Sequence, residues 1–145
     1  MKICFIDKTE FSYSYKDINN SKLRGAESVL INLSSEISKI GHEVAVFNNC
    51  SEEYHKKNLS WNNIEKIKQH QNFDVVISNG DSNFFNLKSS KKNILISHSN
   101  QSIEQFIRKK QYFSFLKYKP KIWMTSNFQV MKRSFFLKMF GYIMI

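Results

Sequence analysis

The sequence predicts an α/β fold built on a mostly parallel sheet, and two observations lead to this prediction. Short apolar runs rich in β-branched and aromatic residues recur along the chain, and longer segments with helical spacing separate them. The runs are continuous rather than alternating, as expected of strands that are covered on both faces. Strands are therefore expected at residues 3–7, 43–47, 74–78, 93–97 and 121–125.

The strongest helical pattern lies between the first two of these strands. Gly41 follows its last apolar position and suits a left-handed helix end, after which the chain leads directly into the second strand. This order predicts a βαβ unit that joins two parallel strands. The apolar face of the helix consists of Ala26, Val29, Leu30, Leu33, Ile37 and Ile40.

Two further helices are expected, with less regular patterns. One begins near Ser60, a suitable N-cap, and its apolar face would consist of Trp61, Ile64 and Ile67. The other runs from about residue 102 to residue 118, and Pro120 ends it. The polar segment 48–58 leaves room for a weak strand near residues 54–59.

The composition predicts one globular unit in a reducing compartment. The chain has 145 residues, of which 41% are hydrophobic and 23% charged, so one sizeable core is expected. No apolar run is long enough to span a membrane or to serve as a signal peptide. Cys4 and Cys50 form no metal or disulfide pattern, and a cytoplasmic location is therefore expected.

The net charge of +10 raises the question of a polyanionic partner. Nearly all of the excess is lysine, whereas proteins that read bases favour arginine. Abundant lysine, asparagine and isoleucine also fit the coding bias of an AT-rich genome. We therefore do not expect nucleic acid to be the main partner.

Polar residues follow each expected strand, where open parallel sheets bind their ligands. His98 follows the fourth strand and can donate a hydrogen bond to a sugar hydroxyl or a phosphate. Gly25 lies just before the first helix, where free N–H groups and the helix dipole favour an anion such as a diphosphate, and Arg24 can add a charge-assisted contact. Glu27 either takes part in this site or stabilises the helix dipole alone.

Several site classes lack their sequence patterns in this chain. The Gly-x-Gly-x-x-Gly fingerprint and the P-loop are both absent, which excludes the common dinucleotide-dependent dehydrogenases and P-loop nucleotidases. No His, Cys or carboxylate pair has the spacing of metal ligands, and no nucleophile elbow is present. No metal and no cofactor are expected.

The order of these features resembles the N-terminal half of a family 4 glycosyltransferase of the GT-B type. The resemblance rests on Arg24-Gly25-Ala26-Glu27 before the first helix and Gly41-His42-Glu43-Val44 after it. It is extended by Phe73-Asp74-Val75-Val76-Ile77 and by Ile94-Leu95-Ile96-Ser97-His98, and it covers most of residues 1–130. Arg24 stands where family members often carry a second glycine.

The resemblance implies a Rossmann-like, three-layer α/β/α domain over residues 1–130 that forms one half of a GT-B fold. Such an enzyme transfers a sugar from a nucleotide-sugar to a hydroxyl in polysaccharide or glycolipid synthesis, and its acceptor can be lipid-linked. It retains the anomeric configuration of the sugar and needs no metal. A peripheral position at the inner face of the membrane is compatible with this role. The implied site residues are His98 as the catalytic residue, Arg24, Gly25 and Glu27 toward the donor's phosphates and sugar, and Asn79, Asp81, Ser99 and Asn100 in the acceptor-side cleft.

The resemblance also implies a second domain that holds most of the donor. Family members carry a Glu-x7-Glu motif there, whereas the last acidic residue of this chain is Glu104. Residues 131–145 are therefore expected to be the start of a truncated continuation, and the chain alone is expected to be inactive. This apolar segment either completes the core as a terminal helix or stays exposed and drives self-association.

Two other interpretations of the sequence remain open. The first is a basic binder of anionic membrane or nucleic acid, in which lysines and arginine interleave with Tyr112, Phe113 and Tyr118. The basic residues of that surface would be Arg108, Lys109, Lys110, Lys117, Lys119 and Lys121. The second is a flavodoxin-like phosphate-binding domain with Asp7 in an acidic pocket.

Overall fold

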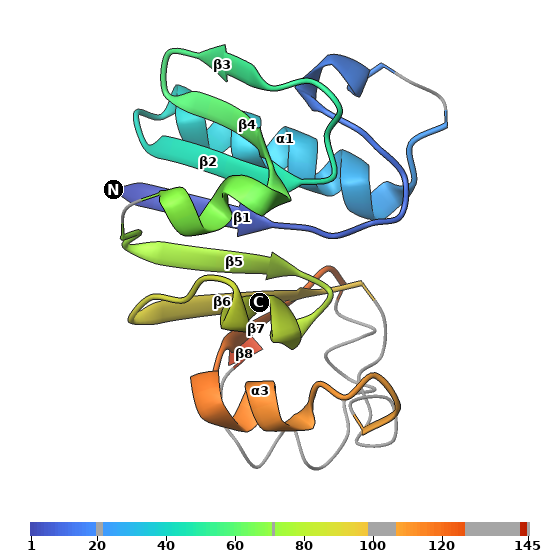
Figure 1. Ribbon diagram of the computed structural model, residues 1–145, viewed down its shortest axis with the longest axis vertical. Coiled ribbons are helices and arrows are strands. Elements are labelled where there is room, and N and C mark those ends of the chain that lie inside the picture. The colour runs from blue at the N-terminus through green and yellow to red at the C-terminus, as the bar shows by residue number, and fades with distance from the viewer. Residues whose placement is uncertain (20–21, 71, 99–106, 127–142, 145) are drawn as a thin grey trace.

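The structure, a computed structural model, describes residues 1–19, 22–70, 72–98, 107–126 and 143–144, which form one sheet with helices on both faces (Figure 1). The elements in chain order are β1 (Lys2–Ile6), η1 (Tyr15–Asp17), α1 (Gly25–Lys39), β2 (Glu43–Asn48), β3 (Tyr54–Lys56), β4 (Leu59–Asn63), η2 (Ile64–Gln69), β5 (Val75–Asn79), η3 (Ser82–Asn86), β6 (Lys92–Ser97), α3 (Tyr112–Tyr118), β7 (Lys121–Met124) and β8 (Ile143–Met144), where η denotes a 3-10 helix.

The described strands lie in the order β3-β4-β2-β1-β5-β6-β7-β8. Every neighbouring pair is parallel except β3 and β4, which form an antiparallel hairpin at one side of the sheet. Ile3 pairs with Val44 of β2 on one side and with Val75 of β5 on the other, so β1 is a central strand. The five strands expected from the sequence are all present, and the predicted α/β fold with a mostly parallel sheet is confirmed.

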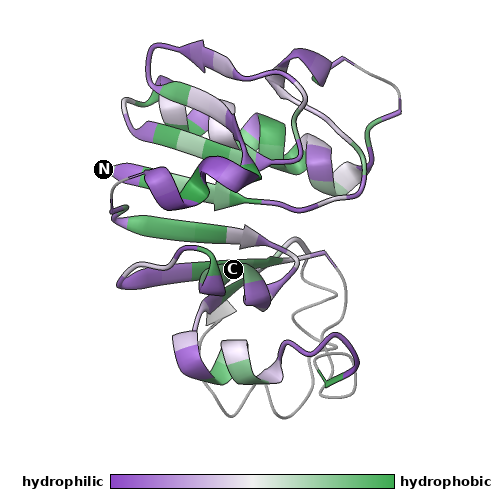
Figure 2. Cartoon of the chain, viewed as in Figure 1, coloured by the Kyte–Doolittle hydropathy of each residue, from purple (hydrophilic) through white to green (hydrophobic). Residues whose placement is uncertain are grey.

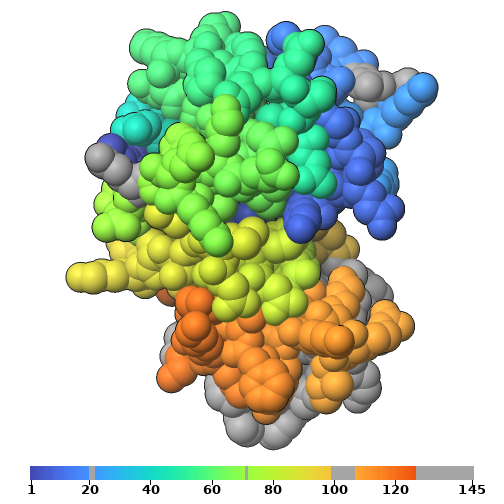
Figure 3. Space-filling model, viewed as in Figure 1, coloured from blue at the N-terminus to red at the C-terminus, as the bar shows by residue number. Residues whose placement is uncertain are grey.

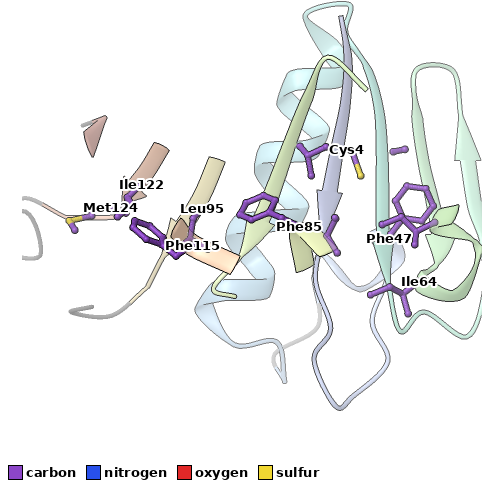
Figure 4. Packing of buried hydrophobic residues seen from close by; sticks show 12 residues of the cluster. Cys4, Phe47, Ile64, Phe85, Leu95, Phe115, Ile122 and Met124 are labelled. Atoms are coloured by element: carbon purple, nitrogen blue, oxygen red, sulfur yellow. The ribbon is translucent and has the colours of Figure 1, made fainter. Parts of the chain in front are cut away.

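Alternate residues of the central strands supply two cores, one on each face of the sheet. On one face, Ile3 and Phe5 of β1 pack in a cluster with Leu30 and Ile31 of α1. On the other face, Cys4 belongs to a cluster that η2, η3 and α3 cover (Figure 4). The apolar strands lie between more polar surface elements, as the hydropathy colours show (Figure 2).

The predicted helix from Ser60 is wrong, because residues 59–63 form strand β4 and only residues 64–69 are helical. Trp61 pairs with Val46 of β2 and is buried on the α1 face. Ile64 and Ile67 lie on the opposite face, at the three-residue repeat of a 3-10 helix. The apparent helical spacing therefore combines residues that face opposite sides of the sheet.

The predicted continuous helix of residues 102–118 is interrupted in the part that the structure describes. Ile107 and Arg108 are helical, but Lys110 has a positive φ of 53°, and α3 begins afresh at Tyr112. At the end of the chain, Ile143 and Met144 pair in parallel with β7 as a strand. Across the described residues, the structure contains no helix with the length and apolar character needed to cross a bilayer.

Leu95 gives a direct test of the packing between the sheet and α3. It is fully buried on β6 in the cluster with Phe115 and Ile122. We predict that Leu95→Ala lowers the free energy of unfolding by about 2–5 kcal/mol, because it leaves a cavity in the core. In urea unfolding, the control Ile40→Ala, at a side chain that is 72% exposed, should change stability by no more than about 0.5 kcal/mol. Equal effects of the two substitutions would contradict this packing.

Candidate functional site

Polar residues from four neighbouring strands form a row along the edge where the parallel strands end, here called the carboxyl edge. Asn48 ends β2, Asp7 follows β1, Asn79 ends β5 and His98 follows β6, and these strands are adjacent in this order. The chain direction across the sheet reverses between β1 and β5, because β2 lies on one side of β1 and β5 on the other. Ligands of open parallel sheets bind at such a reversal.

Asp7 is the central acid of this row and is only 3% exposed. Its carboxylate accepts hydrogen bonds from the Tyr13 hydroxyl, the Asn79 side chain and the Lys8 backbone N–H. Burial raises the pKa of Asp7 above its ordinary value of 3.8, and the hydrogen bonds oppose this increase. Asp7 is therefore a buried structural acceptor that holds the Tyr13 hydroxyl.

Tyr13 comes from the long loop between β1 and α1 and was not among the residues that the sequence pointed to. Its ring is buried edge-on against Trp61, with 5.6 Å between the ring centroids. Its carbonyl oxygen accepts a 2.7 Å hydrogen bond from the Asn48 side chain. Burial and the nearby Asp7 carboxylate raise the pKa of Tyr13, so the hydroxyl stays protonated and remains a donor. The only sequence signal was an aromatic residue within a polar loop.

The Asn79 side chain links Asp7 to His98. Since Asn79 donates its amide hydrogens to the Asp7 carboxylate, its Oδ1 faces the imidazole, 2.6 Å from His98 Nε2. An amide oxygen only accepts, so Nε2 carries the hydrogen and the Nδ1 lone pair of the neutral ring is left as an acceptor. Burial lowers the pKa of His98, which favours this neutral form, although the nearby Glu27 opposes the shift.

At this edge, where Asn48 Oδ1 is buried without a partner among the described residues, Glu27 is a second unusual polar group. It lies in the first turn of α1, is 2% exposed, and its Oε2 atom has no hydrogen-bond partner among the described residues. Its other oxygen lies 3.7 Å from the Arg24 guanidinium, which also stacks over the Phe11 ring at 4.8 Å. Glu27 is close enough to Asp7 and His98 to affect both of their pKa values. A buried carboxylate oxygen without a donor is costly, and a ligand hydroxyl would satisfy it.

Gly25 occupies the first position of α1, and the side chain of Arg24, the N-cap residue, does not cap this end of the helix. Apart from its chain neighbours and the backbone of its own helix, a Cβ atom at Gly25 would meet no described atom within 4 Å, so packing there does not require glycine. The uncapped N–H groups of the first turn and the helix dipole favour an anion. Gly25 and His98 lie on the same edge of the sheet, as the sequence predicted.

The other predicted cleft residues have different positions. Asn79 joins the row, whereas Asp81 caps η3 by accepting a 2.8 Å hydrogen bond from the Asn83 N–H. Burial raises the pKa of Asp81, although this bond opposes the shift. Ser99 and Asn100 lie outside the described residues.

The carboxyl edge thus offers two kinds of binding group. Glu27 Oε2 and His98 Nδ1 are acceptors that suit hydroxyl groups. The start of α1 and Arg24 suit an anionic group. Within the described residues, no group of three or more His, Cys, Asp or Glu side chains could hold a metal ion.

Removing the Tyr13 hydroxyl tests the role of Asp7. We predict that Tyr13→Phe lowers the free energy of unfolding by about 1–3 kcal/mol at pH 7, because the buried carboxylate loses a donor. In the wild type, the pKa of Asp7 is higher in the folded protein than its ordinary value of 3.8, so the folded state binds this proton more tightly than the unfolded state. The contribution of Asp7 to stability therefore falls as the pH rises through its folded pKa. The substitution raises that pKa further, and its cost should therefore be smaller at pH 4 than at pH 7.

The matched control is Tyr15→Phe, which removes a hydroxyl from the same loop while keeping the ring that stacks on Tyr54. Urea unfolding at both pH values provides the measurement. A cost for Tyr13→Phe that does not depend on pH would contradict the role assigned to Asp7.

Comparisons of the chain with protein-family models, with curated proteins and with solved structures give no match.

Proposed function

We propose that this chain is the Rossmann-like, acceptor-side domain of a glycosyltransferase of the GT-B type, similar to family 4. The complete enzyme would transfer a sugar from a nucleotide-sugar to a hydroxyl of a sugar or lipid-linked acceptor. The observation that carries the proposal is the meeting of the α1 N-terminus, Glu27 and His98 at the point where the chain reverses across the sheet. Anion-binding and hydroxyl-binding groups are then available on one edge.

The acceptor groups support a ligand with several hydroxyls. Glu27 Oε2 is buried and has no partner in the described part of the chain, while His98 Nδ1 is left as an acceptor by the Asn79 contact. A sugar hydroxyl donates readily to either atom. A phosphate cannot donate in its fully ionised form, and the charge of a carboxylate repels it, so Glu27 suits the sugar rather than the diphosphate.

The start of α1 supports the diphosphate half of the donor. Its first-turn N–H groups receive no cap from the Arg24 side chain, and the open space at Gly25 lets a phosphate approach the backbone closely. Catalysis in such an enzyme depends on stabilising the departing diphosphate, which uncapped N–H groups and Arg24 can supply. A second domain would hold the rest of the donor, so we do not expect transfer by this chain alone.

The substitution Gly25→Ala tests phosphate binding at the start of α1 without disturbing the fold. A Cβ atom meets no described neighbour there, and alanine is the better helix former, so stability should stay constant or rise. The methyl group would occupy the space that a phosphate needs. We predict that uridine or guanosine diphosphate binds the variant about tenfold more weakly, which corresponds to roughly 1.4 kcal/mol.

Amide chemical shifts measured during the titration locate the binding site. The proposal requires the largest shifts at residues 24–28 and around His98, together with an unchanged affinity in the control Val29→Ala, at a partly exposed position of α1. Shifts confined to other surfaces, or equal affinities of Gly25→Ala and the wild type, would overturn the assignment of the α1 N-terminus.

A second candidate function, docking to an anionic membrane, is favoured by one exposed surface. Ile107 is 59% exposed and Phe113 is 82% exposed, and exposed basic residues lie beside them. We call residues 107–113 the basic turn. Large apolar side chains enter the acyl boundary of a bilayer while neighbouring lysines and arginine attract its anionic headgroups.

The basic turn is held firmly against the body of the protein. The Ser82 hydroxyl donates to the Gln111 carbonyl at 3.0 Å, and the Asn83 amide donates to the Lys109 carbonyl at 3.3 Å. Gln111 itself is buried. Because this anchor fixes the backbone, the exposure of Phe113 is a property of the fold, and little conformational entropy is lost on docking.

Vesicle binding tests this second function. We predict that Phe113→Ser weakens binding to vesicles containing about one third phosphatidylglycerol by roughly tenfold, since burying a phenylalanine contributes about 1.5–3 kcal/mol. The control Ile40→Ser, at an exposed residue at the end of α1, should bind like the wild type. Equal binding by Phe113→Ser, or preference for RNA over vesicles, would contradict a membrane role.

A further inference from the structure

The sequence suggested one basic surface along residues 108–121, but the structure divides it between the two ends of α3. The basic turn lies at the start of the helix, beside η3. Lys119 and Lys121 lie after it and line a cleft of about 390 Å³ at the starts of β6 and β7. We call this the lysine cleft, and its basic residues are Lys91, Lys92, Lys119 and Lys121.

The lysine cleft is separate from the candidate active site. It lies at the amino ends of the strands, whereas His98 follows the carboxyl end of β6. A six-residue strand separates the two regions by roughly 20 Å at about 3.3 Å per residue. In Figure 3 the yellow segment that leads into β6 and the orange α3 meet on the left side of the molecule.

Charge in the lysine cleft is unbalanced. In the part of the chain that the structure describes, no carboxylate lines it. Among the described residues, none of its four ammonium groups forms an ion pair, whereas Lys2, Lys16, Lys39 and Lys66 each pair with a glutamate. Like charges gathered around one concave surface repel one another, and a multivalent anion would offset that repulsion.

The walls of the cleft indicate the size and kind of anion. The apolar lining of the cleft, here called its floor, consists of Val75, Ile94 and the half-buried Tyr118. Its volume is in the range of small-molecule sites. We propose that the lysine cleft binds a small ligand with two or more adjacent phosphate groups, either inorganic polyphosphate or a nucleoside polyphosphate. Four ammonium groups match three to four negative charges, and the apolar floor has room for an attached base.

Calorimetric titration with sodium triphosphate at fixed ionic strength tests the proposal. Lys121→Gln should weaken binding about tenfold, the usual effect of losing one charge-assisted contact. The control Lys68→Gln removes the same charge from an exposed position of η2 and should change affinity less than about twofold. Equal losses in both variants would show that net charge alone attracts the anion, and would overturn the proposal.

A second variant excludes a folding defect. Lys119 has a positive φ of 43°, at the end of α3, where glycine is the favoured residue. Lys119→Gly therefore removes an ammonium group while the melting temperature stays constant or rises. The proposal requires weaker triphosphate binding in this stable variant, and wild-type affinity would contradict it.

Further titrations identify the class of phosphate ligand and distinguish this site from the proposed active site. Tighter binding of adenosine triphosphate than of triphosphate would support a nucleoside ligand, and equal affinity would support phosphate recognition alone. Amide chemical shifts distinguish the two sites, because the proposal requires triphosphate to shift residues 91–94 and 118–121, whether or not residues 24–28 also shift. Absence of saturable binding at millimolar triphosphate, or binding of RNA that triphosphate does not displace, would overturn the proposal.

Discussion

Asp7 is a carboxylate buried just beyond the end of a central strand of the sheet, and such a group needs hydrogen-bond donors. It obtains them from a loop tyrosine, from the end of β5 and from the next backbone amide. Meeting this requirement fixes the path of the loop that carries Tyr13 and the orientation of Asn79. Asn79 in turn orients His98, so the geometry of the candidate site depends on the buried Asp7.

The two edges of the sheet differ in their chemistry. The carboxyl edge gathers buried acids and amides, and the amino ends of β6 and β7 gather lysines. The basic turn and the lysine cleft lie at opposite ends of α3, so a charge run that is continuous in sequence serves two surfaces. One surface is apolar and exposed, which suits a membrane, and the other is concave, which suits a small anion.

The strands were predictable because short, continuous apolar runs bounded by polar residues are typical of strands buried on both faces. The start of α1 was predictable from Gly25 and from the helical spacing of the apolar residues after it. The helix expected at Ser60 failed because period alone cannot distinguish a helix from a strand followed by a 3-10 turn. At the site, Asn79 and His98 were predictable from their positions after strands, and Gly25 from its position at the start of the first helix. The role of Tyr13 and the unpartnered oxygen of Glu27 depend on tertiary contacts within the described chain that no local pattern encodes.

We infer that Asp7, through Asn79, sets the hydrogen-bonding state of His98. Nitrogen-15 chemical shifts of the imidazole at neutral pH measure this directly, because the two ring nitrogens differ strongly when only one carries hydrogen. We expect a neutral ring with hydrogen on Nε2 in the wild type, and a mixture of the two neutral tautomers in Asn79→Ala. Hydrogen on Nδ1 in the wild type, or identical spectra for the two proteins, would contradict it.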